Sequence, residues 1–259
     1  MKSKKTFLDT FLLCLKSLLF FVTYYFICAF VSSLVDLIGE SAGKSVPSSL
    51  IGILAYTTVI LAFTITFFAL KTSIFKESNI AKTKARYIVD GALMGFGYFG
   101  LYQMIAIILQ KIPASWIEWL LNQQKEMAGS QLEGNIALAV IYLSILAPIC
   151  EEIVFRGLML TVLKGVIPKW AAIVACALCF SVMHAPSIIA MVVTFGFGIL
   201  LGFIFYRTNS LIPCILAHVL FNSTNFLLFI PYDIGSYVVL ILSVPAIIYF
   251  VIDISRREK

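Results

Sequence analysis

The sequence predicts an all-α protein: a polytopic membrane helix bundle of about eight transmembrane helices, with both termini in the cytoplasm. Of its 259 residues, 61% are hydrophobic and only 12% are charged, whereas soluble domains carry about 25% charged residues. The apolar runs are about 20 residues long, the length that an α-helix needs to cross a hydrocarbon layer about 30 Å thick. Because lipid offers the backbone no hydrogen-bond partners, these runs must form helices.

Eight apolar runs, separated by short polar connections, are each expected to form one helix. They cover residues 17–38, 49–70, 88–110, 136–163, 170–186, 188–206, 211–230 and 236–253. Residues 1–135 would hold the first three spans and an outer amphipathic loop, and residues 136–259 the remaining spans. The two parts are expected to form a single integrated membrane domain. The N-terminal lysines and first apolar run resemble a signal peptide, but the run is too long for one, so we expect a retained span.

The charges of the connections predict the orientation. Residues 71–87 contain five basic side chains and one acid, whereas residues 111–135 contain three acids and two lysines. By the positive-inside rule, the first segment lies in the cytoplasm and the second lies outside. The amphipathic stretch around Trp116 and Trp119 is expected either to lie along the membrane interface or to pack against the bundle.

Several other patterns carry no function of their own. The net charge of +6 arises at the chain ends and between spans, which indicates topology and not a nucleic-acid-binding face. The six cysteines lie in apolar runs, where they favour packing over a disulfide framework. Gly95, Gly97 and Gly100 spell G-x-G-x-x-G, but no strand precedes them, so they predict close helix packing and not a nucleotide site.

Five ionisable side chains lie deep inside the predicted spans of the second half. They are Glu151, Glu152, Arg156, His184 and His218. A charged group at the centre of a membrane helix costs about 2.5 to 3.5 kcal/mol, so each requires a partner, a water-filled cavity or a function.

Helical geometry assigns these side chains different surroundings. Glu152 and Arg156 are four residues apart, so they can form an ion pair on one face, while Glu151 points about 100° away. His218 and Asn222 are also four residues apart. With a rise of 1.5 Å per residue, Glu151, His184 and His218 lie about 20, 22 and 12 Å from the cytoplasmic ends of their spans, which is compatible with one shared cavity.

Two kinds of chemistry fit this cluster. One carboxylate and two imidazoles can hold Zn²⁺ with a position open for water, which makes Glu151, His184 and His218 candidate metal ligands. Alternatively, Glu151 acts as general base without a metal, while the histidines and Asn222 polarise the scissile carbonyl and bind the oxyanion. Each residue alone is explained as well by a structural role, so the hypothesis depends on their occurring together. Both routes end in hydrolysis of an amide bond.

Three short segments carry motifs that resemble those of a known family. Residues 151–156 spell E-E-x-x-x-R, residues 180–184 spell F-x-x-x-H, and residues 218–222 spell H-x-x-x-N. Together they resemble the motifs of the CPBP family, which comprises type II CAAX prenyl proteases and bacterial bacteriocin-processing or Abi-type membrane proteins. The resemblance covers about 80 residues, and the first three spans show no comparable signature.

The resemblance implies an intramembrane endopeptidase, a hydrolase that acts on membrane-associated peptides or proteins in the plasma membrane of a bacterium. Glu151 would activate water, and Glu152 would support it while pairing with Arg156. The two histidines and the asparagine would complete the site as Zn²⁺ ligands or as oxyanion stabilisers. The family's mechanism leaves both the metalloprotease and the metal-free glutamate route open, and of the two we expect a metalloendopeptidase.

Two other functions are compatible with the sequence. A non-catalytic immunity or regulatory scaffold would keep the fold and bind a partner peptide without cleaving it. A proton-coupled transporter would use the buried carboxylates and histidines as a relay, but no internal repeat of the kind found in many transporters is visible. Lipid and a membrane-associated substrate are the expected partners, and nucleic acid is not.

Overall fold

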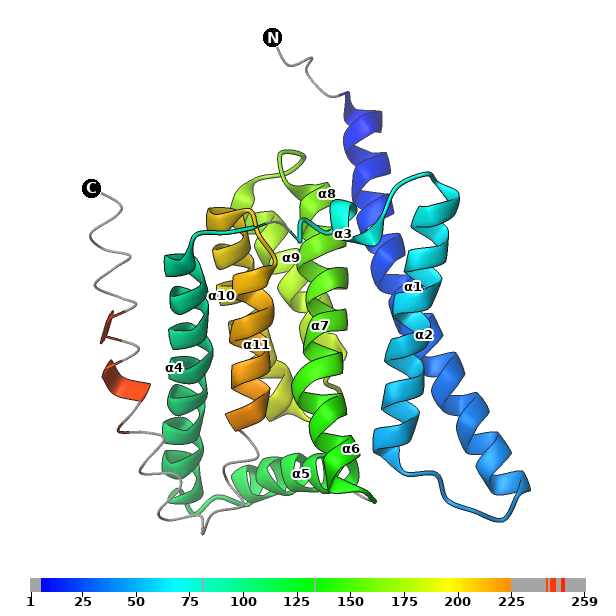
Figure 1. Cartoon of the computed structure of the whole chain (residues 1–259). Helices are drawn as coiled ribbons and strands as arrows, with labels where there is room; N and C mark the ends of the chain where they lie inside the picture. The colour runs from blue at the N-terminus through cyan, green and yellow to red at the C-terminus, as the bar shows by residue number, and fades with distance from the viewer. Residues whose placement is uncertain are drawn as a thin grey trace.

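The computed structural model confirms an all-α membrane bundle (Figure 1). The structure describes residues 6–80, 82–132 and 134–224, together with residues 241, 243–245, 248 and 249. In this part of the chain no β-strand occurs, five helices are long and apolar enough to cross a membrane, and two shorter apolar helices accompany them. Most of the predicted span 236–253 lies outside the described residues, so the count of eight and the location of the termini stay predictions.

Helices α1 (Phe7–Ser41) and α2 (Ser48–Ala69) form a pair at one edge of the bundle, with α1 inclined to α2 (Figure 1). Helix α1 begins ten residues before the predicted span because Thr6 and Asp9 form a reciprocal capping box there. The pair contacts the rest of the molecule mainly through the central helical segment Ile136–Leu163.

Helices α3 (Ile74–Glu77) and α5 (Ser115–Gln131) lie at opposite ends of the bundle, and α4 (Ala85–Gln110) runs between those ends (Figure 1). The basic connection and the acidic connection are therefore on opposite sides, as the positive-inside argument requires.

Helix α5 lies across the end of the bundle (Figure 1) and packs against it, which is one of the two predicted placements; its position along a membrane interface stays a prediction. One face of α5 packs against the bundle. There the hydroxyl of Ser187 donates to Oε1 of Gln124 at 2.7 Å. Trp116 and Trp119 on the other face remain more than half exposed.

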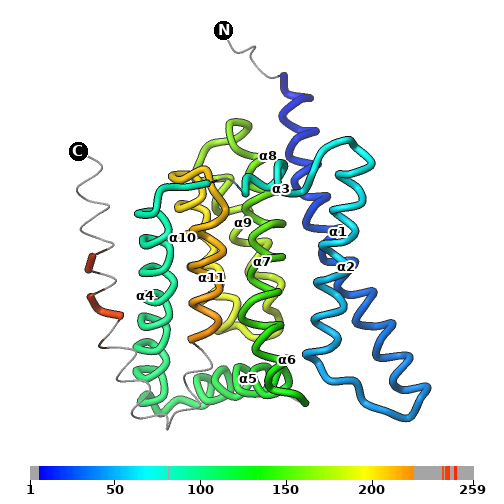
Figure 2. The backbone as a smooth tube through the Cα atoms, viewed as in Figure 1, coloured from blue at the N-terminus to red at the C-terminus, as the bar shows by residue number. Residues whose placement is uncertain are grey.

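A continuous rod, Ile136–Leu163, runs through the middle of the bundle from α5 to the opposite end (Figure 2). Its successive segments are α6 (Ile136–Ile141), the π-helical η1 (Tyr142–Leu146), α7 (Ala147–Glu152), the π-helical η2 (Ile153–Leu160) and α8 (Thr161–Leu163). All eight residues of η2 are buried. π-Helical turns are uncommon and frequently occur at functional sites, and here they flank the two glutamates.

Helices α9 (Lys169–Val182), α10 (Ile188–Thr208) and α11 (Ile212–Thr224) surround the rod. Helix α9 is shorter than the predicted span 170–186, because a turn replaces the helix before Pro186. A proline disfavours helical backbone at the residue that precedes it.

Glycines of α4 let α11 approach closely, as their placement in an apolar span predicts. A Cβ atom on Gly91 or Gly95 would overlap the backbone of Pro213 or Ala217, respectively. Backbone atoms cannot move aside as a flexible side chain can, so the small residues are required for this contact.

The substitution Gly95→Ala is therefore expected to destabilise the bundle, although alanine is the better helix former. Overpacking of this kind costs about 1 to 3 kcal/mol, which thermal unfolding in detergent would detect as a lower midpoint. Gly129→Ala in α5 is the matched control, because a Cβ there meets nothing within 4 Å. Equal midpoints for the two variants would contradict the role assigned to Gly95.

Candidate active site

The buried ion pair predicted from helical spacing is present in the rod. Nη1 of Arg156 donates to Oε1 of Glu152 at 2.7 Å, and the two side chains are 1% and 0% exposed. Nη2 of Arg156 donates to the carbonyl oxygen of Gly198 at 3.3 Å, and the guanidinium lies over the ring of Phe180, 4.6 Å from its centroid. A charge this deeply buried is tolerated only with such compensation.

His218 of α11 is held by the same carboxylate. Its Nδ1 lies 2.8 Å from Oε1 of Glu152. Because a carboxylate paired with arginine only accepts hydrogen bonds, Nδ1 must be the donor. In a neutral imidazole this leaves Nε2 as an acceptor, directed towards Glu151.

Glu151 is 6% exposed and its two oxygens have different neighbours. Oε1 accepts a hydrogen bond of 2.5 Å from the hydroxyl of Tyr56 on α2. Oε2 lies 3.7 Å from Nε2 of His218, which is too far for a direct hydrogen bond. A water molecule beside the line that joins these two atoms can contact both at about 2.8 Å.

Aromatic rings fix the positions of the two histidines. The ring of Phe180 lies 5.0 Å from that of His184 and 5.6 Å from that of His218, edge to face in both cases. Phe197 of α10 contacts the ring of His218 in the same manner, at 5.4 Å. His184 follows the end of α9, and its Nδ1 lies 3.1 Å from the carbonyl oxygen of Phe180.

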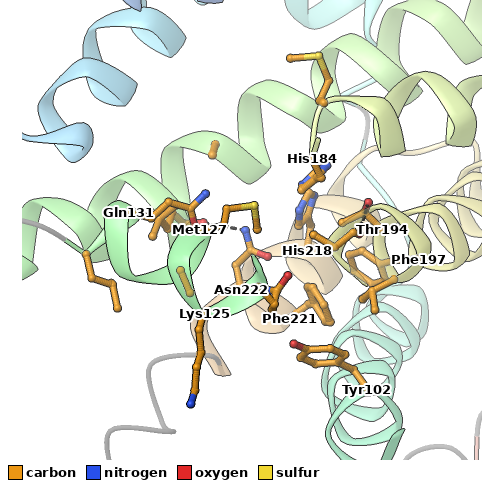
Figure 3. Close-up of a pocket in the computed structure, with 18 of the residues that line it drawn as sticks. Tyr102, Lys125, Met127, Gln131, His184, Thr194, Phe197, His218, Phe221 and Asn222 are labelled. Carbon is orange, nitrogen blue, oxygen red and sulfur yellow. Dashed lines mark hydrogen bonds between the residues drawn. The ribbon is translucent and has the colours of Figure 1, made fainter. Parts of the chain in front are cut away.

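Asn222 lies one turn beyond His218 on α11, and its Nδ2 donates to the carbonyl oxygen of Leu143 in η1 at 2.8 Å. Figure 3 shows its side chain together with those of His218 and Met127 among the residues that line the pocket. The bond to the rod orients the amide in the same space that the histidines face.

Four of the six predicted site residues line one cavity of about 900 Å³: Glu151, His184, His218 and Asn222 (Figure 3). Glu151, His184 and His218 therefore line one cavity, as their depths in the predicted spans indicated. Glu152 and Arg156 do not line the cavity; Glu152 contacts His218, and Arg156 contacts Glu152.

Helices outside the sequence motifs also line the cavity, and α4 contributes Tyr102, Gln103, Ala106 and Gln110. Helix α5 closes it with Gln124, Met127 and Gln131, among others, and α2 supplies Tyr56. Tyr56 and Gln103 are polar side chains in otherwise apolar spans, which was the signal available in the sequence, since a buried polar group requires a partner.

The predicted Zn²⁺ ligands do not converge in this arrangement. Within the described ranges, no three His, Cys, Asp or Glu side chains lie close enough together to hold a metal ion. Nδ1 of His218 and Oε1 of Glu151 are each engaged by a neighbour. A zinc site would require movement of these side chains, so zinc binding stays a prediction. The proposed mechanism uses no metal.

Comparison with known proteins supports the family expected from the motifs. Residues 133–224 match the model of the type II CAAX prenyl endopeptidase Rce1-like family. This segment is similar to the Rce1-like CAAX proteases. It contains all six predicted site residues, whereas Tyr56 and α5 lie outside it, and the family expected from the three motifs is confirmed.

A curated relative supports the same family. The chain is 28% identical over 148 residues to the membrane-embedded CAAX protease MroQ of Staphylococcus aureus (strain USA300). The match covers 54% of this chain and 58% of MroQ, so the chain spans little more than half the length of this relative. No solved structure matches the chain.

Proposed function

We propose that this protein is an intramembrane endopeptidase of a bacterial cell membrane, which hydrolyses peptide bonds of membrane-associated peptides or proteins. The observation that carries the proposal is the buried pair of Glu151 and His218, which face one another at 3.7 Å on the wall of a cavity of about 900 Å³. The match of residues 133–224 to the type II CAAX prenyl endopeptidase Rce1-like family supports the same activity.

In the proposed mechanism, Glu151 is the general base. Its Oε2 removes a proton from a water molecule that Nε2 of His218 also holds, and the water oxygen adds to the scissile carbonyl carbon. Asn222 donates to the oxygen that becomes negative. His184 donates from Nε2 only when its ring is protonated, because Nδ1 donates to the carbonyl oxygen of Phe180. Glu151 then returns the proton to the departing amine as the carbon–nitrogen bond breaks.

Glu152 and Arg156 act through His218 in this mechanism. The carboxylate of Glu152 keeps the proton of His218 on Nδ1 and so keeps Nε2 available as acceptor, a role that outer partners of catalytic histidines commonly have. Arg156 balances the charge of Glu152, which is otherwise buried without solvent.

The test is a cleavage assay in detergent or liposomes on a panel of membrane-associated peptides, with wild type compared with His218→Ala. Cleavage that disappears in the variant, while thermal unfolding shows the variant to be folded, supports the proposal. Cleavage that persists at the wild-type rate would contradict the role of His218.

Chelation tests the metal separately. Since the ligands do not converge, we expect wild-type cleavage to persist after treatment with a zinc chelator, and metal analysis of the purified protein to find no stoichiometric zinc. Loss of cleavage on chelation and recovery on addition of Zn²⁺ would instead establish the metal-dependent route and require the side chains to rearrange.

The two alternatives predict different results. A scaffold would keep its cellular activity when His218 is replaced, and a transporter would show ion flux in proteoliposomes without peptide cleavage. No contact among the described residues favours either over hydrolysis.

A further inference from the structure

A hydrogen-bonded chain of two tyrosines reaches Glu151 from outside the family segment. The hydroxyl of Tyr24, on α1, donates to the hydroxyl of Tyr56, on α2, at 3.1 Å. Tyr56 in turn donates to Oε1 of Glu151 at 2.5 Å. These two hydrogen bonds therefore connect the neighbouring helices α1 and α2 to Glu151, which lies 95 residues beyond Tyr56 in the sequence.

The two rings are held so firmly that the hydroxyls have little freedom. Tyr24 is fully buried, and its ring packs edge to face against Phe155 of the rod and Tyr56, with centroids 5.5 and 6.0 Å away. Tyr56 also contacts the ring of Tyr142, at 5.6 Å. Packing alone would be served as well by phenylalanine, since a hydroxyl in an apolar interior costs free energy unless it is bonded.

The hydrogen bond from Tyr56 decides which oxygen of Glu151 remains for chemistry. A carboxylate has two oxygens; Oε1 is taken by Tyr56, and Oε2 is the one that lies near Nε2 of His218. Without the hydroxyl, the carboxylate could rotate about its terminal torsion, which is broad for glutamate. The water that both groups contact would then lose its fixed position.

We propose that Tyr56, supported by Tyr24, is a positioning residue that holds the Glu151 carboxylate with Oε2 turned towards His218 and the substrate. This inference rests on the proposed endopeptidase function. It makes α1 and α2, which carry no family motif, part of the active site.

The first test is kinetic, on a peptide that wild type cleaves. Tyr56→Phe keeps the ring and removes the hydroxyl, and it is expected to lower kcat about 10- to 100-fold, the effect that a small misplacement of a catalytic group produces. KM should change little, because Tyr56 acts on the base and not on substrate binding. A kcat within about twofold of wild type would overturn the proposal.

A double-mutant cycle separates positioning from packing. Tyr24→Phe alone should lower kcat less than Tyr56→Phe, and it should add no further loss in the Tyr56→Phe background, because it acts only through the missing hydroxyl. Additive losses in kcat, accompanied by additive losses in unfolding temperature, would show that the tyrosines serve packing alone and would overturn the proposal.

Tyr98→Phe is the matched control. Tyr98 is another membrane-embedded tyrosine whose hydroxyl is bonded, to the carbonyl oxygen of Val193 at 2.8 Å, but it does not contact Glu151. The kcat of the Tyr98→Phe variant should stay within about twofold of wild type. An equal loss in Tyr98→Phe and Tyr56→Phe would show that removal of any buried hydroxyl has this effect, against the proposal.

A spectroscopic test works without turnover. The infrared difference spectrum between wild type and Glu151→Gln isolates the carboxyl band of Glu151, and Tyr56→Phe should shift that band. If wild type cleaves no peptide but the band shifts, the proposed function fails while the positioning stands. If the band does not move, the positioning fails whatever the cleavage assay shows.

Discussion

Glu151→Gln is expected to lower kcat for peptide cleavage by about 10² to 10⁴-fold, the range by which a general base accelerates a reaction. Glutamine has nearly the same shape, and its amide oxygen can still accept the hydrogen bond from Tyr56, so the fold should be retained. What the variant loses is the ability to take a proton from water. Initial rates on a cleaved peptide, with thermal unfolding in parallel, measure both quantities.

Glu40→Gln provides the control for Glu151→Gln, because Glu40 lies exposed near the end of α1. The control should cleave at the wild-type rate. Wild-type cleavage by Glu151→Gln would remove the glutamate from the mechanism and favour another nucleophile-activating group in the cavity.

Arg156→Met is expected to cause the largest loss of stability. It leaves the carboxylate of Glu152, which is 0% exposed, without the cation that balances it, and breaking a buried pair in this manner costs about 3 to 5 kcal/mol. Methionine roughly replaces the apolar part of the arginine, so the loss reports the charge more than the volume. Thermal or denaturant-induced unfolding in detergent measures it.

Combining Arg156→Met with Glu152→Gln tests this explanation. The double variant removes both charges and should recover much of the lost stability, because a neutral pair no longer leaves an unpaired charge. It should remain poorly active, since His218 has lost the carboxylate that orients its ring. A double variant less stable than Arg156→Met would show that packing, and not charge, governs the site.

The features that could be predicted from the sequence are those set by local periodicity. The spacing of Glu152 and Arg156 puts them on one helical face whatever surrounds them, and the ion pair is present. The depth of Glu151, His184 and His218 follows from counting residues within each span, and the three side chains do line one cavity.

The features that could not be predicted depend on contacts between distant segments. Tyr56 meets Glu151 across 95 residues of sequence, and nothing in the sequence of α2 specifies which neighbour its hydroxyl will find. The early start of α1 depends on a capping box at Thr6, and the position of α5 beneath the cavity depends on tertiary packing. Zinc ligation and the eighth span stay predictions.

The length of α1 has a consequence for its tilt in the lipid bilayer. At 1.5 Å per residue its 35 residues extend about 52 Å, well beyond a hydrocarbon layer of about 30 Å. The apolar run within it, residues 17–38, extends about 33 Å, close to the thickness of that layer, and a helix of this kind adjusts its tilt to bilayer thickness. Among the residues of α1, all of which are described, only Ser17, Tyr24 and Gly39 are buried. Bilayer thickness therefore acts on a helix whose single buried aromatic side chain adjoins the catalytic carboxylate through Tyr56.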